Sequence, residues 1–303
     1  MEHRELYFEE GKVSKGTRGR SGAILVSGGD HSVQTAGVGL IVENRWHCEI
    51  DSKLFGPHAE HYKNIRRCVI DNHIERTIIR VMEMPINFNK DLQQRISRTG
   101  AIAVLIVDDA EAAVPLAEAL VEGGIDCMEL TLRTPAAFEA LQAIKNKVPR
   151  MVAGVGTVLT SSQVDQAVEV GADFAVAPGL NRRIVERATQ RGLSFAPGVV
   201  TPTEIESAIE LGCRLIKFFP AEPAGGLGYL KSMAAPYEHL GIRYIPLGGV
   251  SRENSTAYLQ SPLISAIGGS FIASRQQIRD QDWEGISKSA ADTRDLVQSA
   301  RGE

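Results

Sequence analysis

From residue 101 onward, short apolar runs alternate with segments whose apolar residues recur at helical spacing. Apolar runs of this length, bounded by turn residues, are typical of buried β-strands. Eight runs fit this description: Ala101–Val107, Met128–Leu132, Met151–Val158, Phe174–Pro178, Phe195–Val200, Leu215–Pro220, Tyr244–Val250 and Ala266–Ile272. The pattern therefore predicts eight buried strands.

The segments between these runs predict amphipathic helices. Ala110–Glu122 has apolar residues at helical spacing and is followed by two glycines, and Ser161–Val170 ends at Gly171 in the same way. Glycine just after the last periodic residue is a common helix stop. Strands and helices that alternate eight times favour an α/β fold of the (β/α)8 TIM barrel type. A doubly wound open sheet is the alternative, but no G-x-G-x-x-G motif follows the first strand to support a dinucleotide site.

The chain changes character near residue 84. Six of its seven histidines lie at or before position 73, and residues 1–83 show no sustained helical or strand period. We expect residues 84–303 to form the barrel domain and residues 1–83 to be a disordered extension or the product of a misplaced start codon. A small accessory domain is the alternative. No metal site is predicted, because the four candidate ligands follow no zinc spacing: His47, Cys48, His58 and His61.

The composition excludes several classes of function. A net charge of −4 gives no reason to expect nucleic acid or an anionic membrane as a partner. No apolar run approaches the roughly 18 residues that span a bilayer, and the charged N-terminus lacks the apolar region of a signal peptide. The four cysteines have no CxxC spacing, which favours free thiols in a reducing cytoplasm.

Lys217 lies inside the apolar run Leu215–Pro220. Burial disfavours the charged form of an amine, so we expect the pKa of Lys217 to fall below its free value of about 10.4. A lysine that is neutral near pH 7 can add to a carbonyl and form a Schiff base. The alternative is an edge lysine whose ammonium group reaches water.

The second predicted strand and the residues just after it carry a row of polar side chains. Leu130 and Leu132 are expected to face the helices. The period of two then places Glu129, Thr131 and Arg133 on the inner face. Bulky aliphatic residues normally fill a barrel, so we interpret Glu129 as a general acid/base and Arg133 as a fork for a substrate carboxylate. A buried Glu129–Arg133 ion pair that only satisfies itself is the alternative.

Three strands end in glycine-rich segments. The third ends in Gly-Val-Gly before Thr157, where glycines let backbone approach a small ligand and the threonine adds a hydroxyl. The seventh ends in Gly248-Gly249, and the eighth ends in Gly269-Ser270. The loops after strands 7 and 8 often bind phosphate, because their backbone N–H groups can surround it. These loops predict a phosphate site, although a single glycine pair is usually only a turn.

Together these groups predict one reaction class. Lys217 would form an imine with a 2-keto acid whose carboxylate Arg133 holds, and the iminium would act as an electron sink. This allows the C3–C4 bond of a 3-deoxy-4-hydroxy-2-keto acid to break, with Glu129 moving protons through water. The chain is therefore predicted to be a class I aldolase that needs no metal and no cofactor.

Six motifs resemble those of the KHG/KDPG aldolase family in their order and spacing. They are Glu129–Thr134, Gly154–Val158, Ala177–Leu180, Ile216–Glu222, Gly248–Val250 and Ile267–Ser270. The resemblance runs from about residue 90 to the C-terminus. It implies a homotrimeric (β/α)8 barrel in the cytoplasm with a role in the Entner–Doudoroff pathway. The implied reactions cleave 2-keto-3-deoxy-6-phosphogluconate to pyruvate and glyceraldehyde 3-phosphate, or 4-hydroxy-2-oxoglutarate to pyruvate and glyoxylate.

The resemblance also implies roles for individual residues. Lys217 matches the Schiff-base lysine and Glu129 the acid/base glutamate. Arg133 and Thr157 match contacts to the pyruvate carboxylate, and Pro178 matches a proline that lines the pocket. The phosphate loop region of the family is matched by four residues: Gly248, Gly249, Gly269 and Ser270.

Leu247 departs from the family, whose members commonly carry Thr or Ser before this glycine pair. In the family that hydroxyl is linked to stereochemical choice, so 2-keto-3-deoxy-6-phosphogalactonate is an alternative substrate. Decarboxylation of oxaloacetate by the same imine chemistry is another alternative. A non-catalytic barrel that binds a sugar phosphate is disfavoured by the combination of Lys217, Glu129 and Arg133.

Overall fold

The structure is a computed structural model that describes residues 8–9, 12–13, 26–27, 47–48 and 88–302. The chain divides into two units, Met1–Met84 and Pro85–Glu303. In the first unit, β1 (Phe8–Glu9) pairs antiparallel with β2 (Lys12–Val13), and β3 (Val26–Ser27) pairs antiparallel with β4 (His47–Cys48). The expectation that residues 1–83 are a disordered extension concerns residues that lie mostly outside the described part of the chain.

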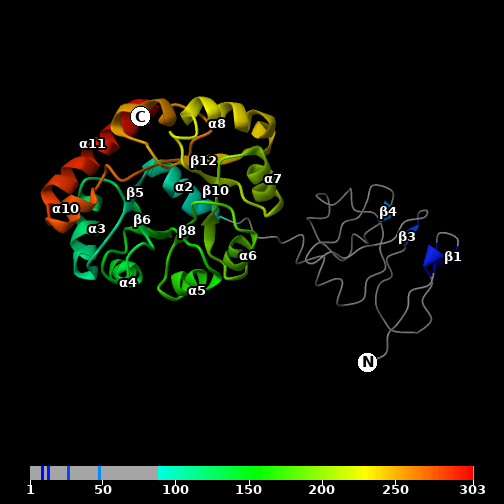
Figure 1. Ribbon diagram of the computed structural model, residues 1–303, viewed down its shortest axis with the longest axis horizontal. Helices are drawn as coiled ribbons and strands as arrows, with labels where there is room; N and C mark the ends of the chain where they lie inside the picture. Colours follow the sequence, from blue (N-terminus) through cyan, green and yellow to red (C-terminus); the bar gives the residue numbers. More distant parts are fainter. Residues whose placement is uncertain (1–7, 10–11, 14–25, 28–46, 49–87, 303) are drawn as a thin grey trace. The chain divides into compact units, whose positions relative to one another are not determined.

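The second unit is a ring of parallel strands with helices on its outside (Figure 1). One sheet has the strand order β13-β5-β6-β7-β8-β9, and the other has the order β10-β11-β12. The strands are β5 (Ala101–Leu105), β6 (Cys127–Thr131), β7 (Val152–Gly156), β8 (Phe174–Val176), β9 (Ser194–Ala196), β10 (Gly198–Val199), β11 (Leu215–Phe218), β12 (Arg243–Pro246) and β13 (Ile267–Gly269). Neighbours follow one another in sequence, and β13 pairs with β5.

Two junctions let the sheet curl. The strand predicted over Phe195–Val200 is split into β9 and β10 at Pro197, which has no N–H for the ladder. At the other junction, a parallel bridge joins Tyr244 to Ile264, and the Ser265 N–H donates to the Tyr244 carbonyl over 3.0 Å. The predicted α/β fold with a curled parallel sheet is confirmed. The doubly wound alternative is wrong, because the strand order never reverses.

Helices connect the strands. They are α2 (Lys90–Thr99), η3 (Ala110–Ala112), α3 (Ala113–Glu122), α4 (Ala137–Lys147), α5 (Ser161–Glu169), α6 (Arg182–Gln190), α7 (Pro202–Glu210), α8 (Gly226–Ala234), η4 (Ala235–Leu240), α9 (Arg252–Leu259), α10 (Arg275–Arg279) and α11 (Trp283–Arg301). Capping boxes at Thr160, Thr201 and Ser251 start α5, α7 and α9 soon after a strand ends. The predicted helix Ala110–Glu122 is divided into η3 and α3.

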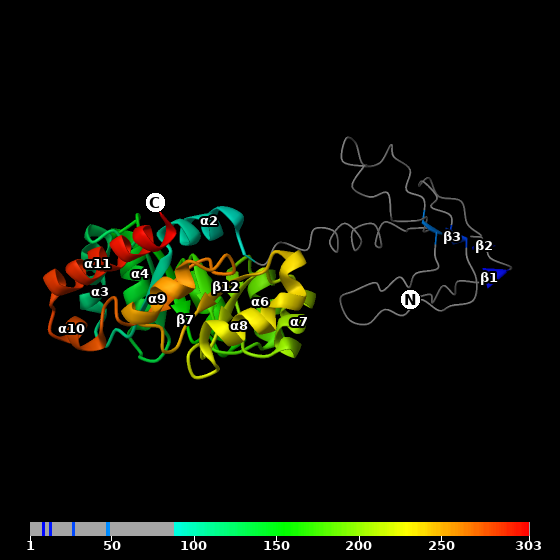
Figure 2. The same cartoon turned by 90° about the horizontal axis from the view of Figure 1, so that it is seen from above.

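Side chains pack on both faces of the curled sheet. In β11, Leu215 belongs to a cluster inside the ring, whereas Ile216 and Phe218 belong to the larger core between the sheet and the helices. Helix α2 covers the amino-terminal end of the inner cluster with Ile96, which is fully buried, and lies at one end of the strands (Figure 2). The ion pair between Arg95 and Asp126, at 2.9 Å, fixes α2 beside the start of β6.

Candidate active site

Lys217 and Glu129 meet inside the ring. Lys217 is in β11 and Glu129 in β6, and these strands are not neighbours in either sheet. The Lys217 Nζ lies 3.6 Å from Glu129 Oε1. Both residues are buried, with exposed fractions of 5% and 1%. The alternation of Leu215, Ile216 and Lys217 confirms that the lysine side chain points inward, as the period of two requires.

Within residues 88–302, the Lys217–Glu129 pair leaves one carboxylate oxygen without a hydrogen bond. Its 3.6 Å separation is an ion-pair distance that is too long for a direct hydrogen bond. Among the described residues, Glu129 Oε1 has no hydrogen-bond partner. A substrate oxygen or one water between the two groups would give the carboxylate a partner, which is the geometry that general acid/base catalysis needs. Burying two charged groups is expensive, so an incompletely bonded pair indicates chemistry more than stability.

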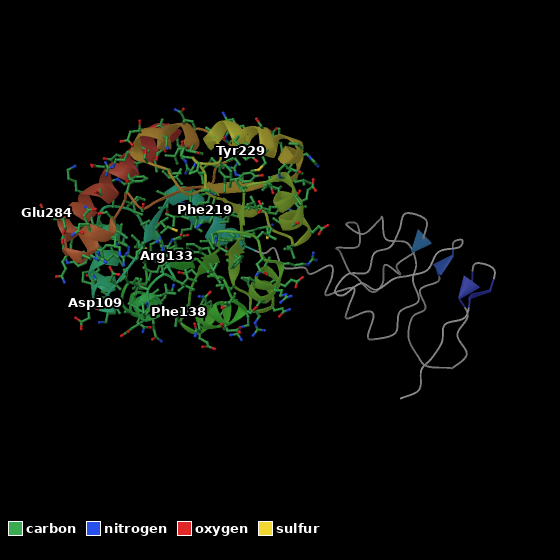
Figure 3. All side chains as sticks on the ribbon, viewed as in Figure 1. Asp109, Arg133, Phe138, Phe219, Tyr229 and Glu284 are labelled. Carbon is green, nitrogen blue, oxygen red and sulfur yellow. The ribbon has the colours of Figure 1, made fainter. Side chains whose placement is uncertain are left out.

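Phe219 is a further neighbour of the lysine that the sequence reasoning left without a role. The Lys217 Nζ lies 5.3 Å from the centroid of the Phe219 ring, a distance suited to a cation–π contact. Arg133 and Phe219 both lie in the central part of the ring (Figure 3). A signal was present in the sequence, because Phe219 continues the alternation of Leu215 and Lys217 in the predicted strand Leu215–Pro220. In the structure β11 ends at Phe218, but Leu215 and Phe219 both pack in the inner cluster.

Gly154 and Gly156 make room for protein side chains. A Cβ on Gly156 would lie 2.7 Å from Glu129 Oε1, and a Cβ on Gly154 would lie 2.6 Å from the Phe174 ring. Contacts this short do not occur in relaxed structures. The glycines of β7 were predicted to let the backbone approach a ligand. In the structure they leave space for the carboxylate of Glu129 and for the Phe174 ring, which belongs to the inner cluster.

Arg133 lies in the turn that follows β6, because the strand ends at Thr131. Two threonine hydroxyls fasten this turn to the β5 segment. Thr131 Oγ1 donates to the Leu105 carbonyl over 3.0 Å, and Thr134 Oγ1 donates to the Val107 carbonyl over 2.5 Å. Arg133 is exposed, and within the described residues its guanidinium has no bond, so the Glu129–Arg133 ion pair is not formed. The Arg133 guanidinium is therefore available to a carboxylate ligand.

Thr157 and Pro178 follow the ends of β7 and β8. Thr157 is half-buried and has a φ of 62°, a left-handed conformation that is costly for a β-branched residue. Such strain collects at functional sites. Pro178 is half-buried, and its carbonyl packs so tightly against Gly198 that a Cβ there would lie 2.2 Å away. Gly198 is the register partner of Lys217, so Pro178 borders the lysine strand.

The predicted phosphate residues lie after β12 and at the end of β13. Gly248 and Gly249 have φ values of 91° and 83°, which only glycine adopts easily. Gly269 is buried at the end of its strand, whereas Ser270 is exposed, and its hydroxyl has no bond within residues 88–302. Parallel strands point the same way, so these residues, Arg133, Thr157 and Pro178 share the carboxyl-terminal end of the sheet.

Leu247 is 5% exposed and belongs to the inner cluster. A Cβ on Gly268 of β13 would lie 2.4 Å from Leu247 Cγ. The leucine therefore packs across the inside of the sheet, directly before the glycine pair. Its apolar side chain offers no hydrogen-bonding group at this position.

An ion cluster fastens the loop after β5 to α10. Asp108 pairs with Arg275 and, at 2.8 Å, with Arg279. Hydrogen bonds from the two guanidiniums hold the pKa of Asp108 well below its usual range.

The described residues contain no group of three or more His, Cys, Asp or Glu side chains that could hold a metal ion. In this same part of the chain, no helix is both long and apolar enough to cross a membrane.

Comparison with known proteins places the chain in a family. The model of KDPG and KHG aldolase matches residues 92–289. The chain belongs to the KDPG and KHG aldolase family. It is 39% identical over 204 residues to 2-dehydro-3-deoxy-phosphogluconate aldolase of Treponema pallidum, covering 67% of this chain and 96% of that protein. It is 37% identical over 213 residues to KHG/KDPG aldolase of Escherichia coli, covering 70% and 98%.

A solved structure gives the same result. KDPG aldolase from Legionella pneumophila, with pyruvate captured as a covalent carbinolamine intermediate, is 33% identical and superposes with a TM-score of 0.63. The match covers 66% of this chain and 97% of the other. This chain is thus an aldolase, a carbon–carbon lyase, and its curled sheet is that of the family.

Proposed function

We propose that this chain is a class I aldolase that cleaves 2-keto-3-deoxy-6-phosphogluconate to pyruvate and glyceraldehyde 3-phosphate, and 4-hydroxy-2-oxoglutarate to pyruvate and glyoxylate. The observation that carries the proposal is the buried Lys217–Glu129 pair, with 3.6 Å between nitrogen and oxygen. The covalent pyruvate intermediate of the Legionella pneumophila enzyme supports the same chemistry here.

In this mechanism the Lys217 amine attacks C2 of the keto acid. Glu129, acting through water, moves the protons that convert the carbinolamine into an iminium and release water. Arg133 holds the carboxylate through paired hydrogen bonds, with Thr157 beside it. These contacts fix C2 against the amine, so the reaction gains from orientation as well as from the covalent bond.

The iminium then accepts the electron pair of the C3–C4 bond. As that bond breaks, the C4 hydroxyl loses its proton and C4 leaves as an aldehyde, while the three carbons on Lys217 become an enamine. Protonation of C3 and hydrolysis of the imine release pyruvate and restore the amine. The backbone of Gly248, Gly249 and Gly269 and the Ser270 hydroxyl would hold the phosphate at the far end of the substrate.

Covalent trapping tests this proposal. Borohydride added with pyruvate is expected to reduce the imine and leave a stable adduct on Lys217, located by peptide mass spectrometry. Lys231, which is exposed in α8, is an internal control that should stay unmodified. An adduct elsewhere, or none at all, would contradict the mechanism.

Leu247 supports a second substrate. Its buried apolar side chain offers no hydroxyl to a hydroxyl-bearing carbon of the substrate. 2-Keto-3-deoxy-6-phosphogalactonate is therefore the second candidate. Rates with the two epimers, measured for the natural chain and for Leu247→Thr, would separate them: a shift toward the gluconate in the variant supports a selecting role for this position.

We also propose that residues 84–303 are sufficient for catalysis and act in a homotrimer, as the resemblance implies. The chain started at Met84 should cleave the same substrates at the rate of the full chain. A lower rate would assign residues 1–83 a part in activity. Analytical ultracentrifugation of both forms measures the oligomeric state, which should be a trimer in each case.

A further inference from the structure

The glycine pair after β12 has its carbonyls bonded and its N–H groups open. The Gly248 carbonyl accepts from the Glu222 N–H over 2.9 Å, and the Gly249 carbonyl accepts from Asn254 Nδ2 over 3.0 Å. The N–H groups of Gly248 and Gly249 have no acceptor among residues 88–302. Because the two carbonyls are bonded to protein groups, the loop presents its unbonded N–H donors to an anion.

Glu222 is the center of this arrangement. It lies in the loop between β11 and α8 and packs so closely on the glycine pair that a Cβ on Gly249 would lie 2.6 Å from Glu222 Cβ. On its other side, a Cβ on Gly226 would lie 3.0 Å from Glu222 Oε1. The side chain thus passes between two glycines, each with positive φ. Any larger residue at Gly249 would force the loop apart.

A buried tyrosine fixes the carboxylate. Tyr258 of α9 is 1% exposed, and its hydroxyl donates to Glu222 Oε1 over 2.5 Å. Burial, and then the bond to Glu222, raise the pKa of Tyr258 well above its usual range, so the hydroxyl keeps its proton and stays a donor. Tyr258 therefore connects the helix that follows the glycine pair to the loop that follows the lysine strand.

We propose that Glu222 and Tyr258 are positioning residues that hold the Gly248–Gly249 loop in the conformation that receives the substrate phosphate. The inference rests on the proposed function and adds to it two residues that need not touch the substrate. Because Glu222 follows Lys217 on the same segment, the pair also sets the spacing between the imine end and the phosphate end. The enzyme would thereby distinguish phosphorylated from unphosphorylated keto acids.

The test compares Tyr258→Phe with Tyr237→Phe. Tyr237 is a matched control, because its hydroxyl also donates to a glutamate, Glu206, over 2.9 Å, on the outer helical layer. Steady-state kinetics are measured with 2-keto-3-deoxy-6-phosphogluconate and with the same keto acid lacking phosphate. For Tyr258→Phe we expect KM for the phosphorylated substrate to rise about tenfold, the usual loss for one hydrogen bond to a charged group. The values of kcat and of KM for the unphosphorylated substrate should stay near those of the control.

Substitutions of Glu222 provide a graded series. Glu222→Gln keeps an oxygen that can accept from Tyr258, so its KM should lie between those of the natural chain and Glu222→Ala. This series carries the test if Tyr258→Phe fails to fold, which circular dichroism would show.

Two outcomes would overturn the inference. Equal losses with both substrates would mean that the pair supports the fold in general, and a KM equal to that of Tyr237→Phe would mean that it positions nothing. Failure of the proposed function is distinguishable, because then the natural chain itself would give no pyruvate adduct on Lys217.

Discussion

Two layers of side chains lie inside the curled sheet, and two residues along a strand separate one layer from the other. In β6, Cys127 is followed on the same face by Glu129, and in β11, Leu215 is followed by Lys217. Cys127 and Leu215 belong to the apolar inner cluster beneath α2, whereas Glu129 and Lys217 form the ion pair. A shift of two residues, about 7 Å along a strand, separates the apolar cluster from the Glu129–Lys217 ion pair.

The two layers give their ionisable side chains different environments. Burial raises the pKa of the Cys127 thiol well above its usual value, so this thiol stays protonated and unreactive. Glu129, two residues later, has an oxygen with no bonding partner among the described residues. The apolar layer is fully buried at Cys127 and Leu215, so the charged layer packs on side chains that exclude water. Substitutions in the charged layer should therefore change rates, and substitutions in the apolar layer should change stability.

The largest expected effect comes from Lys217→Met. Without the amine no imine forms, so kcat should fall by more than about a thousandfold. Lys231→Met, in exposed α8, is the control and should retain full activity. Cleavage is followed by coupled detection of pyruvate. Substantial remaining activity in Lys217→Met would place the chemistry elsewhere.

Glu129→Gln should have the next largest effect. The amide has nearly the same shape but cannot act as a general acid or base, so kcat should fall by about a hundredfold to ten-thousandfold. The borohydride adduct should still form at Lys217, more slowly. Exposed Glu139→Gln on α4 is the matched control. If the rates of Glu129→Gln and the control agree, Glu129 is not the proton carrier.

In the apolar layer, Leu215→Ala should lower the free energy of unfolding by about 2 to 5 kcal/mol, the usual cost of truncating a buried leucine. Denaturant titration measures the change, with Leu159→Ala, at a residue that is 54% exposed, as the control. Turnover per trapped active site should stay near the natural value. A large loss of turnover at unchanged stability would show that the two layers are not separate.

The smallest effect is expected for Arg133, which is exposed in the turn after β6. Arg133→Lys keeps the charge but loses the planar fork, so KM should rise about tenfold, equivalent to about 1.4 kcal/mol, with kcat little changed. Arg183→Lys, exposed on α6, should match the natural chain. A fall in kcat without a change in KM would assign Arg133 to the transition state instead of to substrate binding.

Much of this site could be predicted from local pattern. The period of two gave the inward direction of Glu129 and Lys217 correctly, because strand geometry alone sets which face a residue occupies. The period does not apply to Arg133, because the strand ends at Thr131 and Arg133 lies in the turn that follows. Nor did it show that Gly156 accommodates Glu129, since the atoms in contact come from different strands.

The Tyr258–Glu222 bond lay beyond the reach of sequence patterns altogether. Tyr258 belongs to α9 and Glu222 to the loop after β11. Neither residue stands out from its neighbours in the sequence. Their contact depends on how α9 packs on the sheet, which is a property of the whole unit.

The sequence by itself determined the alternation of strands and helices, the family, and the inward direction of Glu129 and Lys217, because these follow from short-range periodicity and residue chemistry. Tertiary structure decided the rest. The curl of the sheet brings Glu129 Oε1 of β6 within 3.6 Å of Lys217 Nζ of β11, and the packing of α9 sets the glycine loop. Both depend on contacts between residues far apart in the chain, where no local repeat specifies distance.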